Sequence, residues 1–288
     1  MFMPDGARIL FATRPGTAKL AGAFPMVWKI ATFNVNSIRS RLGIVQAWLQ
    51  QNKPDVLCVQ EIKCLDADFP FQALGEAGYE ASVCGQKSYH GVAILSRRKP
   101  DLVRRGFGDG GPDIGARLIA ARIDSIWVFN SYVPQGRSPD NPAFEEKLSF
   151  FTRLKELFMR DHSPSEPIIW AGDINVAPED NDVFAPDRMA GKVGFHPLER
   201  QALADVAAWG FTDLFRKRHP EERRFTFWDY RLPGSFHKDL GWRIDHIRAT
   251  ECVANALIDC RVDSAPRGLP VPSDHAPVLA EIELERVF

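Results

Sequence analysis

Short apolar runs, each ending close to a polar side chain, recur along most of this chain. Runs of this kind occupy residues 27–35, 55–61, 91–96, 118–123, 126–133, 168–171, 242–249 and 277–284. Their lengths and their bounding polar residues are typical of buried β-strands. The pattern therefore predicts a fold built on β-sheets.

Helices are predicted between several of these strands. One apolar stripe, with spacings of four, three and four residues, consists of Ile38, Leu42, Val45 and Leu49. It predicts a helix that ends before Pro54. Asn141 followed by Pro142 is typical of a helix start, with the Asn side chain as the cap. A third helix is predicted over residues 197–209.

The connections between the strands indicate the fold class. The turn at Asp124 and Ser125 is short enough to join 118–123 and 126–133 as an antiparallel hairpin. Hairpins with interspersed helices favour an α/β fold in which two packed mixed or antiparallel sheets are flanked by helices. A wound parallel sheet that binds a nucleotide cofactor is disfavoured, because no G-x-G-x-x-G opens a helix after a strand and no P-loop is present.

Residues 1–25 differ from the rest of the chain. They contain three Pro and three Gly and show no sustained periodicity. We interpret them as a disordered or non-native N-terminal extension, and we expect residues 26–288 to form a single domain. With 45% hydrophobic residues, 288 residues are enough for a sizeable core.

Composition limits which cellular compartment and which binding partners are compatible with the sequence. The five cysteines are scattered and form no C-x-x-C pair, so a reducing, cytoplasmic compartment is favoured over a disulfide framework. No apolar run reaches the length of a membrane span. The net charge of −1 provides no bulk attraction to nucleic acid. Local basic clusters, such as 97–99, 104–105, 216–219 and 223–224, are either solvated surface or phosphate contacts around an acidic site.

Polar side chains lie at or near the ends of the predicted strands. They are Asn34, Glu61, Tyr132, Asp173, Asn175, Asp245 and His275. If these strand ends share one rim, the side chains form one pocket, and Asp173 and Asn175 share a strand face. Most of them carry amide or carboxylate oxygens, which suit Mg²⁺ or Mn²⁺ better than zinc. Such a set can bind a metal, position water and accept a proton, as phosphoester hydrolysis requires.

Each of these residues also has a structural interpretation. Asn34 could be a turn amide, Glu61 a helix-capping carboxylate and Tyr132 an aromatic at the edge of the core. Asp245 could be an ion-pair partner of Arg243 or Arg248. The functional interpretation is preferred because it explains all of them together.

Segments of the chain resemble the exonuclease III family of abasic-site endonucleases, within the endonuclease/exonuclease/phosphatase superfamily related to DNase I. The resemblance is carried, in order, by residues 32–36, 59–63, 91–96, 130–134, 172–175, 225–231, 242–245 and 273–275. It covers about residues 27–286 and leaves out the first 25. It implies one catalytic domain with a four-layer α/β sandwich fold, and a monomer that acts on damaged double-stranded DNA without a membrane, in a bacterial-type cytoplasm at the nucleoid.

The resemblance also implies roles for individual residues. Glu61 is similar to the principal metal ligand, with Asn34 and Asp274 around the metal. Asp173 is similar to the residue that positions or deprotonates the attacking water, and Asn175 to the residue that orients it. Tyr132 and His275 resemble groups that contact the phosphate, and Asp245 resembles the group that orients the histidine ring.

The substrate side of the site is implied in the same way. Phe227, Trp242 and Ile244 resemble the residues that pack against a flipped-out sugar without a base, and flipping costs least where no base stacks. Further implied substrate contacts are Asn36, Lys63 and Gln135. Phe227, Trp242 and Ile244 could instead belong to an ordinary apolar core cluster.

The sequence is therefore compatible with three functions. The preferred one is cleavage of DNA on the 5′ side of abasic sites, together with 3′-5′ exonuclease and 3′-phosphodiesterase activity. The second is a general nuclease or a phosphatase for a non-DNA phosphoester. The third is a DNA-binding relative that has lost catalysis, which is disfavoured because no motif position is broken.

Overall fold

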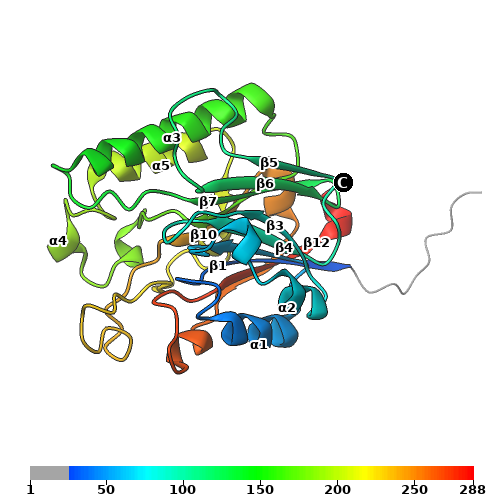
Figure 1. Cartoon of the computed structure of the whole chain (residues 1–288). Helices are drawn as coiled ribbons and strands as arrows, with labels where there is room; N and C mark the ends of the chain where they lie inside the picture. The colour runs from blue at the N-terminus through cyan, green and yellow to red at the C-terminus, as the bar shows by residue number, and fades with distance from the viewer. Residues whose placement is uncertain (1–25) are drawn as a thin grey trace, which may run out of the picture.

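The computed structural model describes residues 26–288, which form two six-stranded sheets (Figure 1). The expected extension, residues 1–25, lies outside the described residues. In chain order the strands are β1 (Val27–Asn34), β2 (Val56–Gln60), β3 (Glu80–Cys84), β4 (Val92–Ser96), β5 (Leu102–Arg105), β6 (Leu118–Ile123), β7 (Ile126–Tyr132), β8 (Ile168–Asp173), β9 (Thr212–Asp213), β10 (Asp245–Ala249), β11 (Leu257–Val262) and β12 (Val278–Glu283). The first sheet has the order β11-β12-β1-β2-β4-β3, and the second has the order β5-β6-β7-β8-β10-β9.

The helices are α1 (Leu42–Asn52), α2 (Phe71–Glu76), α3 (Pro142–Asp161), α4 (Pro186–Met189), α5 (Pro197–Ala207), α6 (Leu214–Arg218) and α7 (Glu251–Asn255). The predicted start of α3 is confirmed. Asn141 Oδ1 accepts a hydrogen bond from the Ala143 amide at 3.0 Å, and Pro142 is the first helical residue. None of the helices in residues 26–288 combines the length and the apolar character that crossing a bilayer requires.

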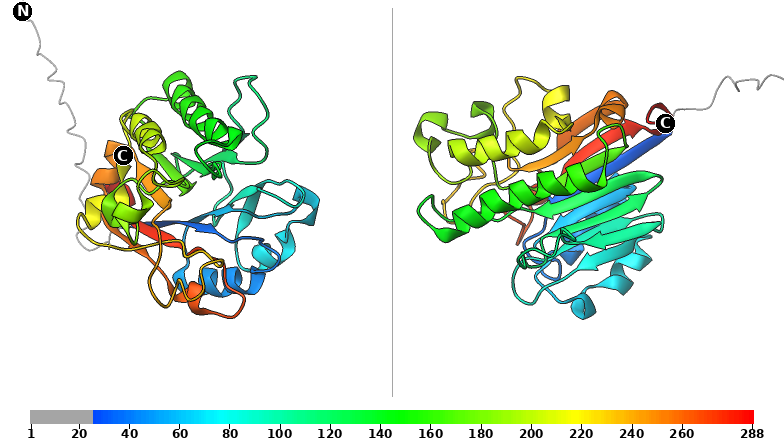
Figure 2. Two further views of the ribbon diagram at one scale, coloured as in Figure 1. Left: turned by 90° about the vertical axis from the view of Figure 1, so that its left-hand side faces the viewer. Right: turned by 90° about the horizontal axis from the view of Figure 1, so that it is seen from above.

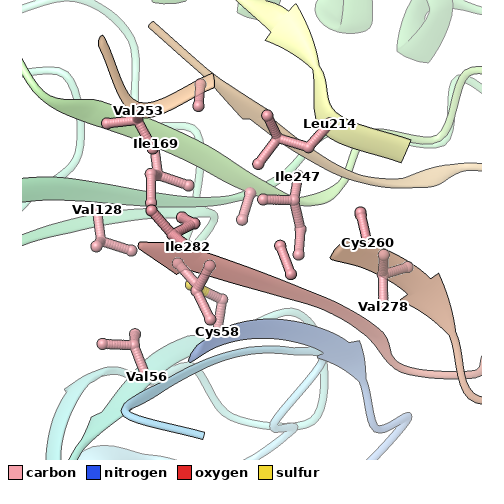
Figure 3. Packing of buried hydrophobic residues seen from close by; sticks show 14 of the residues in the cluster. Val56, Cys58, Val128, Ile169, Leu214, Ile247, Val253, Cys260, Val278 and Ile282 are labelled. Atoms are coloured by element: carbon pink, nitrogen blue, oxygen red, sulfur yellow. The ribbon is translucent and has the colours of Figure 1, made fainter. Parts of the chain in front are cut away.

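The elements form four layers (Figure 2). Apolar side chains from the inner faces of both sheets make the central core, among them Cys58, Val128, Ile169 and Ile247 (Figure 3). Helices α1 and α2 cover the outer face of the first sheet. Helices α3 and α5 cover the outer face of the second, where phenylalanines of α3 pack on Trp170. The predicted fold class, two packed mixed sheets flanked by helices, is confirmed.

The strand directions bring six strand ends to one edge of the two packed sheets, which we call the rim. β1 and β2 are parallel, as are β7 and β8, and these four strands end at the rim. β10 runs antiparallel to β8, and β12 runs antiparallel to β1, so their first residues lie at the same rim. Polar groups at or just after the ends of four strands, and at or just before the starts of two others, therefore lie close together.

The structure differs from the sequence prediction in the first residue of one helix and of one strand. Helix α1 begins at Leu42 and not at Ile38, because residues 38–41 form a turn and Arg41, with φ −114° and ψ 14°, lies outside the helical region. Strand β10 begins at Asp245 and not at Trp242, because Trp242 pairs with Phe227 outside the sheet. The residues before Asp245 are thus free to line the pocket.

Four strands carried no clear sequence signal: β3, β5, β9 and β11. Each lies at or next to the edge of a sheet, and all four residues of β5 are exposed. An edge strand buries little of its surface, so its hydrophobic pattern is weak.

Candidate active site

Asn34 joins two carboxylates at the rim. It lies at the end of β1, fully buried, and its Nδ2 donates to Glu61 Oε1 at 2.9 Å and to Asp173 Oδ2 at 2.8 Å. Its Oδ1 accepts from the backbone N–H of Asn36 at 3.0 Å. The amide offsets part of the repulsion between the two carboxylates. Asn34, expected beside the metal, therefore turns its nitrogen and not its oxygen toward them.

Several residues at the rim have an uncommon backbone conformation. Asn36, Glu61, Lys63 and Asn175 have φ values of 46°, 51°, 53° and 55°. Non-glycine residues in this left-handed region are rare, and each costs on the order of 1–3 kcal/mol that the surrounding structure must offset. Strain of this kind concentrates at functional sites, and here it lies just beyond the strand ends.

The expectation that Asp173 and Asn175 share a strand face is wrong, because β8 ends at Asp173. Asn175 follows in the left-handed turn, and its backbone N–H donates to Asp173 Oδ1 at 3.0 Å. Its Nδ2 donates to the carbonyl of Val133 at 2.9 Å. Both side chains still line the same pocket, so a turn and not a shared face brings them together.

His275 lies between two buried carboxylates. Its Nδ1 is 2.8 Å from Asp245 Oδ2, and its Nε2 is 3.8 Å from Asp173 Oδ2. Its ring also lies 4.8 Å from the ring of Phe227, centroid to centroid. The bond to Asp245 fixes the orientation of the imidazole and directs Nε2 toward the reacting end of the pocket.

The alternative partners of Asp245 are engaged elsewhere. Arg243 binds Asp182 at 2.6 Å and Asp213 at 2.9 Å, and Arg248 binds Asp213 at 3.3 Å. Both arginines are buried. The interpretation of Asp245 as an ion-pair partner of either arginine is therefore wrong.

Burial and neighbouring charges set the protonation of the central pair. Burial raises the pKa of Asp173 to about 7, while the charge of His275 acts in the opposite direction. Burial alone would lower the pKa of His275, but the charges of Asp245 and Asp173 outweigh it and raise that pKa to about 10. The imidazole is therefore protonated at neutral pH and can donate to an anionic oxygen.

Lys63 brings a positive charge to the metal side of the rim. Its Nζ lies 2.8 Å from Glu61 Oε2 and also donates to Asn36 Oδ1. Asn36 Nδ2 donates in turn to Asp274 Oδ1 at 3.0 Å. Burial would raise the pKa of Glu61, but the hydrogen bond and the charge of Lys63 outweigh it and lower that pKa. An ammonium group thus stands among carboxylate and amide oxygens.

The donor set fits a hard divalent cation. Ligand atoms of Glu61, Asp173 and His275 lie within 4.8 Å of one another. His275 is the poorest ligand of the three, because its Nδ1 is held by Asp245 and a protonated ring has no free lone pair. The oxygens that remain suit Mg²⁺ or Mn²⁺.

Tyr132 closes another side of the rim, at the end of β7. The guanidinium of Arg117 lies 4.8 Å from the centre of its ring, and Arg117 Nη1 donates to its carbonyl at 3.2 Å. Burial, followed by the charges of Glu61 and Asp173, holds the pKa of Tyr132 well above its usual range. The phenol therefore stays neutral and can act as a hydrogen-bond donor. It lines the pocket and is not confined to the core edge.

The pocket has a volume of about 470 Å³, and one of its walls is apolar. Phe227 and Trp242 exchange two backbone hydrogen bonds of 2.9 Å each, which holds their side chains side by side. Ile244 is 6% exposed and lies in the same wall. The three predicted pocket residues therefore lie together, in the same cavity as Asp173 and His275.

Two other lining residues, Val193 and Gly194, were not singled out from the sequence. They come from a loop without periodicity, so no pattern pointed to them. Asp229 and Arg231, from the segment 225–231 that carries the family resemblance, also line the pocket, and Arg137 joins the exposed Gln135 at its mouth. Gly194 approaches Trp242 so closely that a Cβ there would lie 3.1 Å from the indole.

Of the two interpretations left open for the basic clusters, solvated surface or phosphate contact, the structure excludes phosphate contact at the rim for two of the arginines. Arg216 is 9% exposed and is bound to Glu179 at 3.1 Å and to Asp182, so it is a structural ion-pair partner. Arg97 directly follows the last residue of β4, Ser96, which pairs with the first residue of β2, Val56. Because β2 ends at the rim, Arg97 lies at the opposite end of the sheet. Phosphate contact by these two residues at the site is therefore excluded.

The comparisons with known proteins agree with this geometry. The endonuclease/exonuclease/phosphatase family matches residues 31–275. Exodeoxyribonuclease III of Haemophilus influenzae is 34% identical over 267 residues, which are 88% of this chain and 100% of that protein.

Two solved structures are also similar over nearly their whole length. An AP endonuclease from Archaeoglobus fulgidus is 44% identical with a TM-score of 0.86, and the match covers 89% of this chain and 99% of that one. A 3′-5′ exonuclease from Neisseria meningitidis is 40% identical with a TM-score of 0.84, over 88% and 99% of the two chains. Sequence, fold and site agree, and the chain belongs to the endonuclease/exonuclease/phosphatase family, in its exonuclease III branch.

Proposed function

We propose that this protein is a metal-dependent DNA-repair phosphodiesterase that cleaves the backbone on the 5′ side of abasic sites. The observation that carries the proposal is that Asp173 and His275 share one cavity with Phe227, Trp242 and Ile244. The polar groups suited to hydrolysis therefore lie in the same cavity as a small apolar wall. Relatives named exodeoxyribonuclease III, AP endonuclease and 3′-5′ exonuclease support it, and they support added exonuclease activity. A related 3′ phosphatase from Neisseria supports activity at 3′ ends, in which we include 3′-phosphodiesterase activity.

Glu61 is the residue we propose as the principal ligand of Mg²⁺ or Mn²⁺, with Asp274 and Asn34 close by. The oxygen-rich surroundings of Lys63 support this assignment, because they already accommodate a positive charge. When bound, the ion would supply charge that stabilises the phosphate in the transition state. Asn34 contributes by holding the carboxylates of Glu61 and Asp173 together.

The protein groups divide the proton transfers between them. Asp173 accepts a proton from the attacking water, and Asn175 orients that water and holds Asp173 through its backbone N–H. His275, charged and fixed by Asp245, donates from Nε2 to a phosphate oxygen. Tyr132 donates to another phosphate oxygen through its neutral phenol.

The apolar wall selects the substrate. Phe227, Trp242 and Ile244 form a small surface that suits a deoxyribose without a base. Such a sugar can flip out of the DNA duplex at the lowest free-energy cost, because it has no base to unstack or unpair. Gln135 at the mouth, with Asn36 and Lys63 beside the metal side, contacts the DNA strand that enters. Phosphate contacts position the strand, and the wall recognises the missing base.

The remaining assignments are part of the same proposal. Residues 26–288 act as one catalytic unit, because the site draws side chains from both sheets. The protein acts as a monomer on damaged double-stranded DNA, and a related Neisseria 3′ phosphatase has been solved with a product DNA hairpin. All five cysteines are free, in keeping with a reducing, cytoplasmic location at the nucleoid.

The test is incubation with a duplex that carries one abasic analogue, in Mg²⁺ or in EDTA, beside an undamaged duplex of the same sequence. We expect a single cut 5′ to the analogue in Mg²⁺ only. Equal cleavage of both duplexes would favour a general nuclease. Binding without cleavage would favour the silent relative, and inactivity on DNA with hydrolysis of a small phosphoester would favour a phosphatase.

A further inference from the structure

Behind the pocket, helices α3 and α5 share a buried ion pair. Lys147 of α3 and Glu199 of α5 have fully buried side chains and are in direct contact. Glu199 Oε1 also accepts from the backbone N–H of His196 at 2.9 Å, which caps the start of α5. The pair therefore ties two helices together at the end nearest the rim.

Lys147 reaches beyond this pair to the loops of the site. Its Nζ donates to the carbonyl of Asn175 at 2.7 Å, and it lies 3.4 Å from the carbonyl of Gln135. Both of these residues line the pocket. One buried ammonium thus holds two pocket loops from behind.

Burying an ion pair carries a large desolvation cost. Removing both charges from water costs several kcal/mol per ion, and a well-packed apolar pair of similar volume is often at least as stable. Burial lowers the pKa of Lys147, and the charges of Glu199 and Asp173 act against that shift. Stability alone therefore does not explain a charge at this position, whereas the two carbonyl contacts do.

We propose that Lys147, kept charged by Glu199, is a positioning residue that fixes the turn at Asn175 and through it the Asp173 carboxylate. Asn175 has a φ of 55°, so its turn needs external support. Lys147 holds the carbonyl of that residue, and the N–H of the same residue holds Asp173 Oδ1. Lys147 touches neither substrate nor metal in this role. The inference rests on the proposed function, in which Asp173 and Asn175 handle the attacking water.

The test uses variants that separate positioning from stability. Lys147→Met leaves the buried Glu199 carboxylate without a positive charge beside it, so that variant is expected to lose stability. Lys147→Met/Glu199→Gln removes both charges at nearly constant volume and keeps an acceptor for the His196 N–H. Phe158→Leu, in the same helix and equally buried but outside the pocket, is the matched control.

The expected result is a kinetic change without unfolding. The double variant should keep a thermal midpoint close to that of the wild type and lose about 10- to 100-fold in kcat, the range expected when a reacting group is misplaced by about 1 Å. KM should change by less than about twofold, because only a contact that matters in the transition state is lost. Hydrogen exchange at the Asn175 amide should become faster. Phe158→Leu should lower the thermal midpoint with kcat unchanged.

Two outcomes overturn the proposal: a double variant with wild-type kcat, or unchanged exchange at the Asn175 amide. The wild type is assayed in parallel on abasic duplex and on bis(p-nitrophenyl) phosphate. If the wild type does not cleave abasic DNA, the proposed function fails. The role of Lys147 is then decided by the exchange measurement and by kcat on the simple diester.

Discussion

His275 Nε2 lies 3.8 Å from Asp173 Oδ2, which is within ion-pair range but too long for a direct hydrogen bond. Each group is therefore free to bind a third partner, the imidazole as a donor and the carboxylate as an acceptor. A phosphate and an attacking water meet these requirements.

The first prediction is metal dependence through Glu61. Glu61→Gln should weaken metal binding and lower the cleavage rate about 10²- to 10³-fold, as expected when one electrostatic group of a site is lost. The measurement is the cleavage rate of abasic duplex against Mg²⁺ concentration. Glu80→Gln, an exposed residue on β3, is the control and should behave as the wild type. Full wild-type activity in EDTA would show that the metal assignment is wrong.

The second prediction separates catalysis from binding. Asp173→Asn and His275→Ala should each lower cleavage by at least about 10²-fold, the usual size of a lost proton-transfer group. Affinity for abasic DNA should stay within a few-fold, because arginines and lysines supply most phosphate contacts. A gel shift with each variant measures this. Loss of DNA binding in both variants would contradict the assigned roles.

The third prediction concerns selectivity. Trp242→Ala should enlarge the pocket and lose about 1–3 kcal/mol of apolar contact with the sugar. The quantity to measure is the ratio of cleavage at abasic sites to cleavage of undamaged DNA, which should fall. Trp209→Ala removes the same side chain from a position against Phe158, away from the pocket, and should leave the ratio unchanged. An unchanged ratio in Trp242→Ala would favour a general nuclease.

The fourth prediction concerns the glycine before Asp173. Gly172 has a φ of +143°, and a Cβ at this position would lie 2.0 Å from the carbonyl oxygen of Ser131 on the neighbouring strand. Gly172→Ala should therefore cost about 3 kcal/mol or more, from overpacking and backbone strain combined. In α1, Gly43→Ala meets nothing within 4 Å and should stabilise by up to about 1 kcal/mol. Urea unfolding of both variants tests the contrast, and equal midpoints would refute it.

The fifth prediction is loss of stability in acid through Asp213. Burial would raise the pKa of Asp213, but the charges of Arg243 and Arg248 outweigh it and hold that pKa well below its usual range. A carboxyl with a depressed pKa stabilises the fold above its unfolded pKa of about 3.9 and loses that contribution as the pH falls through the folded value. The free energy of unfolding should therefore drop below about pH 4.

The check on this prediction is Asp213→Asn. This variant should be less stable at neutral pH by about 3–5 kcal/mol, because it leaves buried arginines short of a partner. Its free energy of unfolding should also change less with pH below about pH 4. If the wild type and Asp213→Asn show the same slope in that range, Asp213 is not the group responsible.

Several features follow from the sequence because local rules decide them. Strand β7, the hairpin it forms with β6 and the capped start of α3 depend on neighbouring residues, and all three were predicted. The polar residues at the strand ends were also found from the sequence, because a polar side chain that ends an apolar run stands out. Their number and order were enough to indicate the family.

Other features depend on contacts between distant parts of the chain, and only the tertiary structure decided them. Asn175 reaches the pocket through a left-handed turn, and its support comes from Lys147, which lies 28 residues away in α3. The nitrogen of Asn34 faces Asp173 across 139 residues. Such contacts arise when two sheets pack face to face, and burial then alters backbone strain, hydrogen-bond partners and pKa values in ways that no local pattern encodes.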